Sequence, residues 1–373
     1  MDAFRSRRLF LQVGACTAAG LALPPLGDDE PSTGDQTERD APLSPTRLKL
    51  AELLVRVHAK DAELRTSSTN HLPMALCALA AIGGTDAQLA RFFESEFPTL
   101  EPFPKDELPA DDHPWYARLG ERAAFPRFVA HFRAELASKP RADVLREALV
   151  HLEPALAAFA FHGLIRTAYA VRVGDAEELA HGLGFWASRA APFAAIDTKD
   201  GVEPDPTKLA AVLRQDVVLG ADTSGGSVMI RMAAATKRPG FAAAVSALRV
   251  EDATLDRLSS LAARAYLANG NLTTLHGVTG TQAYRVLEPY VADRNRARRT
   301  LWQALASVYL GTGAPELAPL DAPAPPSWDT VLGAARERLD DHDVKLADAA
   351  REEERVLGGA LHRRAAAKRL GLG

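Results

Sequence analysis

Apolar residues recur at helical spacing along most of this chain, and this periodicity limits the fold more than any other feature. Leu48, Leu53, Leu54 and Val57 begin the pattern. Hydrophobic residues make up 47% of the 373 residues but aromatic residues only 6%, and alanine and leucine, which favour helix, supply most of the apolar mass. Strands do not alternate with helices, so a doubly wound sheet is disfavoured. We therefore expect a single large all-α domain over residues 45–373.

Capping and breaking residues divide this pattern into separate helices. Asn70 can cap the helix that follows it, while Pro154 and Gly174 should interrupt a long helical block. Residues 228–230 are the only segment expected to form a short strand. A basic tail is expected after the last helix. The predicted helical segments cover residues 71–82, 142–191 with two breaks, 206–219, 239–249, 253–268, 272–288, 291–310 and 328–358.

The N-terminus carries an export pattern. The segment Ser6-Arg7-Arg8-Leu9-Phe10-Leu11 matches the twin-arginine motif, and the apolar run after it is shorter than the roughly 20 residues of a membrane span. We predict a twin-arginine signal peptide over residues 1–25 and a disordered, acidic linker over residues 26–44. The pattern predicts a protein that the twin-arginine export machinery carries, already folded, to the periplasm.

The two cysteines bear on anchoring and on disulfides. Cys16 lies in the leader, where Val13-Gly14-Ala15-Cys16 resembles a lipobox, so a lipid on Cys16 would make an envelope anchor. The leader or this lipid is the only membrane contact that we expect. Because Cys77 alone would remain in the mature chain, no internal disulfide is predicted.

Several common function classes find no support in the sequence. A formal net charge of −4 gives no reason to expect a nucleic-acid partner. The nearest approach to a dinucleotide fingerprint, Gly182-x-Gly184, lies inside a helical pattern rather than after a strand. The zinc-protease motif His-Glu-x-x-His and the hydrolase motif Gly-x-Ser-x-Gly are both missing.

Four of the ten histidines stand in short apolar segments far apart in sequence: His71, His162, His276 and His342. Burying an unpaired polar group costs roughly 1–3 kcal/mol, so each imidazole needs partners for its nitrogens. Each one alone is more simply explained as a structural residue that bonds to the backbone. Four together raise the hypothesis that they bind one metal ion, and neutral imidazoles suit iron, zinc, copper or nickel.

Residues near two of these histidines could extend such a site. Lys345 lies one helical turn after His342, and a buried neutral lysine can react with carbon dioxide to give a carbamate, which is an oxygen ligand. Asp341 and Asp343 flank His342 and could accept hydrogen bonds from ring N–H groups. Arg166 and Tyr169 follow His162 along one helix face, which is either solvated or the wall of a site.

The remaining histidines are interpreted as structural. His151 lies three turns before His162, about 16 Å along a continuous helix, so the two cannot share one ion. His181 stands near two glycines and a tryptophan and is kept in reserve. The others lie beside charges, in a proline-rich loop or in the basic tail, and they are His58, His131, His113 and His362.

Taken together, four segments resemble the questin oxidase-like family: Asn70-His71-Leu72-Pro73-Met74, His162-Gly163-Leu164-Ile165-Arg166-Thr167-Ala168-Tyr169, Leu275-His276-Gly277-Val278-Thr279 and His342-Asp343-Val344-Lys345-Leu346. The resemblance covers most of the chain from about residue 45 and leaves His181 outside the pattern. It implies a largely helical fold and oxidation of an aromatic polyketide by molecular oxygen. Such proteins have been described either as NADPH-using, Baeyer–Villiger-type enzymes or as non-haem iron oxygenases with histidine ligands and a modified lysine.

We predict that one iron is bound by the four histidines, with carbamylated Lys345 as a fifth ligand. Arg166 and Tyr169 are expected to orient an aromatic substrate or to stabilise developing oxyanion charge. Two alternatives stay open: a monooxygenase that uses NADPH without a bound metal, and a non-catalytic helical binding protein of the cell envelope. Rings that converge within about 4–5 Å would favour the metal, because metal–nitrogen distances are near 2.1 Å.

Overall fold

The computed structural model describes residues 45–66, 68–110, 112–195, 201–218, 228–338 and 340–373, and this part of the chain is helical. It contains sixteen α-helices, α2 to α17, and its only β-pairing consists of three isolated bridges. The predicted all-α fold is therefore confirmed. The leader and the linker expected over residues 1–25 and 26–44 lie outside the described residues.

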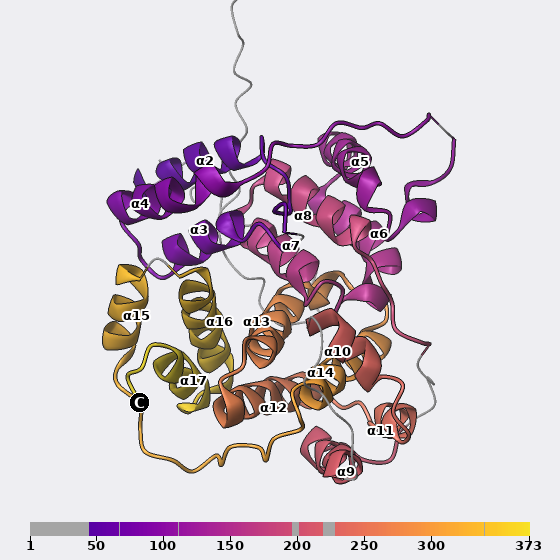
Figure 1. Cartoon of the computed structure of the whole chain (residues 1–373), viewed down its shortest axis with the longest axis vertical. Helices are drawn as coiled ribbons and strands as arrows, with labels where there is room; N and C mark the ends of the chain where they lie inside the picture. Colours follow the sequence, from indigo (N-terminus) through magenta and orange to yellow (C-terminus); the bar gives the residue numbers. More distant parts are fainter. Residues whose placement is uncertain (1–44, 67, 111, 196–200, 219–227, 339) are drawn as a thin grey trace, which may run out of the picture.

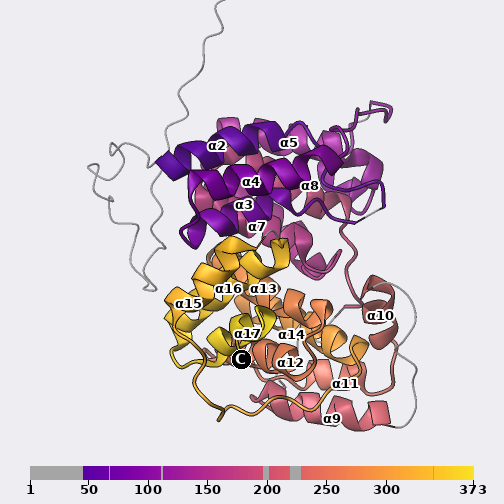
Figure 2. The same cartoon turned by 60° about the vertical axis from the view of Figure 1, so that its left-hand side comes forward.

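The helices form two groups, one above the other in Figure 1, and Figure 2 shows the same division from another side. A single hydrophobic core cluster contains residues of both groups. The upper group consists of α2 (Pro45–Val57), α3 (Leu72–Ala81), α4 (Asp86–Glu96), α5 (Phe125–Ser138), α6 (Arg141–Leu152), α7 (His162–Val173) and α8 (Ala176–Ser188). The lower group consists of α9 (Pro206–Val218), α10 (Val228–Ala235), α11 (Phe241–Ser246), α12 (Thr254–Asn269), α13 (Leu272–Leu287), α14 (Arg294–Gly311), α15 (Trp328–Glu337), α16 (Asp341–Leu357) and α17 (Leu361–Arg369).

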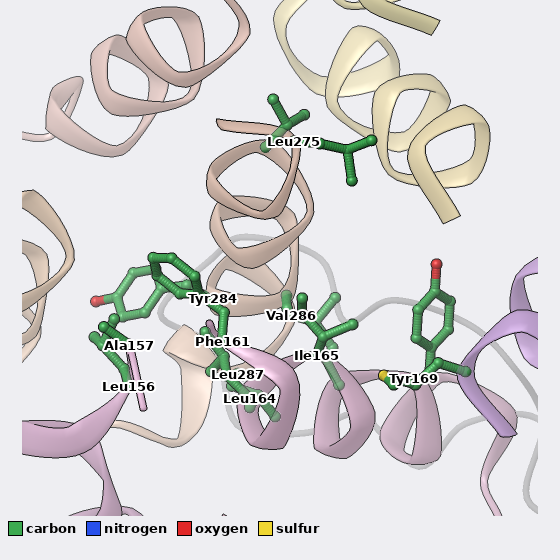
Figure 3. Packing of buried hydrophobic residues seen from close by; sticks show 14 of the residues in the cluster. Leu156, Ala157, Phe161, Leu164, Ile165, Tyr169, Leu275, Tyr284, Val286 and Leu287 are labelled. Carbon is green, nitrogen blue, oxygen red and sulfur yellow. The ribbon is translucent and has the colours of Figure 1, made fainter. Parts of the chain in front are cut away.

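Two helix pairs join the groups: α7 packs against α13, and α3 packs against α16. Gly280 allows the first pair to approach closely, since a Cβ atom there would lie 2.7 Å from the ring of Phe161. Figure 3 shows Phe161, Leu164 and Ile165 in the apolar layer between α7 and α13. This junction positions the site described below.

Most predicted helix boundaries agree with the structure. The long block breaks on both sides of Pro154, because α6 ends at Leu152 and α7 starts at His162. It breaks again at Gly174, whose φ of 78° is easy for glycine and costly for other residues. Asn70 contributes to the start of α3 by accepting a hydrogen bond from the amide of Leu72 at 3.1 Å. Residues 328–358 form two helices, α15 and α16.

Two predictions about secondary structure are wrong. Residues 228–230 are not a strand but the first turn of α10, because the apolar pattern continues at helical spacing to the buried Met232 and Ala235. The expected basic tail is the helix α17, which buries His362 and three alanines while its three arginines are half-buried. Among the described residues, no helix is both long enough and apolar enough to span a membrane.

Candidate metal centre

The starts of four helices meet where the two groups join, and each carries one of the four histidines. His71 immediately precedes α3, and His162 is the first residue of α7. His276 lies in the second turn of α13, and His342 is the second residue of α16. Each group of helices thus supplies two imidazoles, and their proximity depends on how the groups pack together.

The four rings form one cluster, which we call the four-histidine centre. The Nε2 atom of His162 lies 2.8 Å from Nε2 of His71 and 3.1 Å from Nε2 of His276. The His342 ring is 4.9 Å from the His71 ring and 5.2 Å from the His276 ring, measured between centroids. The expected convergence is therefore observed for His71, His162 and His276, whose ligand nitrogens lie within 4.8 Å of one another, whereas His342 forms a second potential ligand set with His71 and Asp341. The role of all four as metal ligands stays a prediction.

An oxygen acceptor faces the other nitrogen, Nδ1, of every ring. The Nδ1 of His162 donates to the carbonyl of Phe159 at 2.5 Å, and that of His276 donates to the carbonyl of Leu272 at 2.6 Å. Asp341 contacts the other two rings. Its Oδ2 lies 2.5 Å from Nδ1 of His71, and its Oδ1 lies 2.9 Å from Nδ1 of His342. Since carbonyl oxygens only accept, the two backbone contacts assign the ring protons of His162 and His276 to Nδ1 and leave their Nε2 atoms with a free lone pair.

Burial keeps three of these rings neutral. His162 and His276 are each 7% exposed, and desolvation, followed by the neighbouring rings, lowers the pKa of both well below the ordinary value. Desolvation and then the positive charge of Lys345 lower the pKa of His71 to about 4. These imidazoles are therefore unprotonated at neutral pH, which is the form that binds metals.

Lys345 and Asp341 complete the charged part of the centre. Lys345 is 2% exposed, and its Nζ lies 2.8 Å from Oδ2 of Asp341, so the lysine contacts a carboxylate instead of lying in a wholly apolar pocket. Burial by itself would raise the pKa of Asp341, but Lys345 and the two histidines that contact it hold the pKa well below its usual range. Both Lys345 and His71 approach Oδ2 at angles outside regular hydrogen-bond geometry.

A comparison with protein families decides what kind of chain this is. The family model described as questin oxidase-like matches residues 68–350, which is more than half of the chain. The chain belongs to the questin oxidase-like family. The match includes His71, His162, His276, His342 and Lys345. Membership in the questin oxidase-like family indicates an oxidoreductase. A comparison with curated proteins finds no match.

Arg166 and Tyr169, expected to orient substrate in this questin oxidase-like protein, are engaged with carboxylates away from the imidazoles. Arg166 is 1% exposed and donates from Nε and Nη2 to Glu178 at 2.7 and 2.9 Å. The hydroxyl of Tyr169 bonds to Asp348, and burial followed by that charge raises the pKa of Tyr169 well above 10. Among the described residues, no contact with a histidine of the centre supports their predicted catalytic role.

The histidines interpreted as structural lie elsewhere. His58 and His181 stack at 4.8 Å in the upper group, and His151 stacks on Tyr116 at 4.1 Å. His362 is buried and lies 2.9 Å from the Ser259 hydroxyl. Of the ten histidines in the sequence, the structure thus brings to the centre the four that the apolar segments and the family resemblance selected.

Two backbone carbonyls, those of Phe159 and Leu272, belong to the centre and could not be predicted from residue type. The first is presented by three successive left-handed residues, Phe159, Ala160 and Phe161, with φ of 50°, 55° and 66°. Such a turn is rare for residues other than glycine, and no sequence signal announces it. Asp341, in contrast, can be predicted from the sequence as a partner of ring N–H groups, because it is the residue before His342.

Proposed function

We propose that this protein is an iron-dependent oxygenase that oxidises an aromatic, quinone-like substrate with molecular oxygen. The four-histidine centre would hold one iron through Nε2 of His71, His162, His276 and His342, and carbamylated Lys345 would add an oxygen ligand. The observation that carries the proposal is the convergence of neutral Nε2 atoms whose rings already have their Nδ1 protons paired with oxygens.

The donor set fits such an ion. Lone pairs on two nitrogens only 2.8 Å apart repel each other unless a cation or a proton lies near both. Two nitrogens that bind one ion at right angles, each at about 2.1 Å, are about 3 Å apart, which is close to the separations observed. This spacing supports a six-coordinate ion such as iron better than tetrahedral zinc, and imidazole ligands suit iron.

When bound, iron supplies the redox chemistry that activates molecular oxygen. The protein's own residues hold the imidazoles in one tautomer, exclude water from the deep side and leave one side open. The His162 and His276 rings are at the deep side, whereas the side chains of His71 and Asp341 are 23% and 20% exposed. We therefore place the approach of substrate at the side of His71 and Asp341.

Carbamylation of Lys345 is a balanced reaction that needs only carbon dioxide. The Lys345 ammonium first releases one proton to solvent. The neutral amine then attacks the carbon, one C–N bond forms, a second proton leaves the nitrogen for solvent and a carbamate anion results. The position of Lys345, one turn along α16 from His342, would place a carbamate oxygen near the imidazoles. Intact mass measured under native conditions should show the mass of one added CO₂ in wild type and none in Lys345→Arg.

Metal analysis tests the proposal directly. Wild-type protein purified without chelators should contain about one iron per chain, as expected for one site. His162→Ala removes the Nε2 atom that lies next to Nε2 of both His71 and His276, so this variant should not retain the metal. His181→Ala, which removes an equally buried histidine outside the centre, is the matched control and should retain it. Iron well below one equivalent in wild type, or iron unchanged in His162→Ala, would contradict the proposal.

The substrate class is tested by oxygen uptake with a panel of anthraquinones. Iron-loaded protein should consume oxygen with at least one of them, and iron-free protein should not. Consumption of NADPH together with oxygen by metal-free protein would instead support the metal-independent monooxygenase. Protein that binds a panel member without oxygen uptake would support the non-catalytic envelope binding protein.

We also propose export to the periplasm through the twin-arginine machinery. The sequence motif that supports this lies at residues 6–11, outside the described residues. Cell fractionation of the full chain, compared with Arg7→Lys combined with Arg8→Lys, checks the proposal. The wild type should appear in the periplasm or, if Cys16 is lipidated, in the envelope, and the double variant should accumulate in the cytoplasm.

A further inference from the structure

We infer that Asp341 is a positioning residue that fixes the tautomer and orientation of two imidazoles from opposite helix groups, and that the centre therefore holds a single ion. This inference rests on the proposed metal function and concerns how the site is built. Asp341 is the only carboxylate that joins these histidines in a potential ligand set within the described part of the chain.

The two oxygens of Asp341 divide their contacts between the groups. Oδ2 lies 2.5 Å from Nδ1 of His71, next to α3, and Oδ1 lies 2.9 Å from Nδ1 of His342 on α16. A ring that donates to this carboxylate carries its proton on Nδ1 and offers Nε2 to the centre, and we infer that Asp341 selects this tautomer in both rings. Because one rigid carboxylate sets both rings, their mutual orientation does not depend on the metal.

The same carboxylate argues against a second ion. Asp341, His71 and His342 form a set that could by composition hold a metal, and the ring nitrogens nearest Asp341 are the Nδ1 atoms. However, ligand atoms bound to one ion at about 2.1 Å are about 3 Å or more apart, and the 2.5 Å contact from Asp341 to His71 is too short. A second ion would also require His71 to bind metal through both nitrogens and so to lose its last ring proton.

Asp341 differs from its two acidic neighbours on the same turn. Asp343 pairs with Arg338 and Arg369 at 3.0 and 2.6 Å, so its carboxylate is directed away from the imidazoles. Asp340 caps α16 by accepting from the amides of His342 and Asp343, and its nearest oxygen is 3.9 Å from Nδ1 of His342. Three carboxylates of equal charge thus lie within residues 340–343, and Asp341 is the one that contacts both His71 and His342.

The experiment compares the affinity for Co²⁺, used as a spectroscopic probe, in wild type, Asp341→Asn and Asp340→Asn. An asparagine at position 341 can accept from one Nδ1–H only, since its amide group donates toward the other ring. We expect about 10–100-fold weaker binding in Asp341→Asn, as for other residues that orient metal-bound histidines, together with a changed visible absorption of bound Co²⁺. Asp341→Glu should recover part of both.

Asp340→Asn is the matched control, because it removes the same charge from the adjacent residue while asparagine keeps the helix cap. It should leave affinity and spectrum close to those of wild type. Circular dichroism of the metal-free variants shows whether each is folded. If Asp341→Asn does not fold, Asp341→Glu is compared with wild type in its place.

The outcomes separate this inference from the proposed function. Wild type that binds no metal refutes the proposed function. Wild type that binds one ion while Asp341→Asn keeps its affinity and spectrum refutes only the positioning role. Two ions per chain in wild type, with the second lost in Asp341→Asn, would show that Asp341 is a ligand of a second ion.

Discussion

The molecule buries two clusters of histidines, and they differ in where the ring nitrogens are directed. In the four-histidine centre, the Nε2 atoms of His71, His162 and His276 face one another, while backbone carbonyls accept from Nδ1 of His162 and His276. In the second cluster, which consists of His58, His181 and their carboxylate partners and which we call the histidine pair, Nε2 of His58 lies 3.1 Å from Glu178 and Nε2 of His181 lies 3.2 Å from Glu177. Both clusters are buried, so burial alone does not identify a binding site.

The difference teaches which property of a buried histidine indicates a metal. The histidine pair has no convergent lone pairs, because each Nε2 already contacts a carboxylate and Arg166 pairs with the same Glu178. Its groups neutralise one another and stabilise the packing of α7 and α8. The four-histidine centre has donors that converge with no partner of opposite charge at Nε2, and such an arrangement is stable only with a cation or a shared proton.

The largest expected effect tests the histidine pair. Glu178→Gln leaves the Arg166 guanidinium buried without its counter-ion, and breaking a buried ion pair in this way costs about 3–5 kcal/mol of the free energy of unfolding. The iron content of the folded fraction should stay equal to that of wild type. Urea denaturation and metal analysis of the same preparation provide both measurements.

The control is Glu177→Gln, which alters the neighbouring carboxylate. Its ion pair with Arg133 is partly exposed, with 54% and 34% exposed side chains, and the amide oxygen of glutamine can still accept from Nε2 of His181. The loss should therefore be about 1 kcal/mol or less. Loss of iron in folded Glu178→Gln would show that the two clusters work as one site and would remove the distinction drawn above.

The dependence of stability on pH should separate the buried histidines from the Arg166–Glu178 ion pair in the metal-free protein. His71 has a pKa of about 4 when folded and 6.5 when unfolded, so the unfolded chain binds the extra proton between these values. Its contribution, roughly 3 kcal/mol, is complete above pH 6.5 and is lost as the pH falls toward 4. The lowered pKa values of His162 and His276 act in the same direction, as does that of His181, whose pKa is about 4.

The ion pair of the second cluster responds in a more acidic range. Burial would raise the pKa of Glu178, but Arg166 and His58 outweigh it and lower the pKa to about 2, against 4.5 when unfolded. This contribution is present above pH 4.5 and is lost as the pH falls toward 2. Denaturant titrations of wild type and two variants check this assignment. His71→Gln should lose less stability than wild type between pH 6.5 and 4, and Glu178→Gln should lose less between pH 4.5 and 2. Identical pH profiles in the three proteins would contradict the assignment.

The smallest effect concerns the left-handed turn, which only the four-histidine centre has. Ala160 has a φ of 55°, and glycine there should raise the free energy of unfolding by up to about 1 kcal/mol. Metal affinity should not change, since the Phe159 carbonyl that accepts from His162 stays in place.

Ala158→Gly is the matched control, because Ala158 is buried in the same segment but is not among the residues with positive φ. It should destabilise the protein by roughly 0.5–1 kcal/mol. Stabilisation by both substitutions, or by neither, would show that the left-handed conformation stores no strain.

Much of the fold could be predicted because its signals are local. Pro154 and Gly174 interrupt helices through their own backbone chemistry, and the break at each was predicted correctly. The errors at residues 228–230 and in the C-terminal tail arose where a short or strongly charged segment gains its helical structure from packing. Met232, Ala365 and Ala366 are buried against other helices, and such contacts are not visible in a short sequence window.

The sequence by itself determined the all-α fold and which histidines stand in apolar segments, since periodicity and neighbouring residues are local properties. Only the tertiary structure decided the direction of the ring nitrogens, because His162 meets partners 91 and 114 positions away. It also decided that Arg166 pairs with Glu178 and that Asp341, not Asp343, serves the histidines. A side chain's partner depends on which helices pack together, and that packing is the outcome of the whole core.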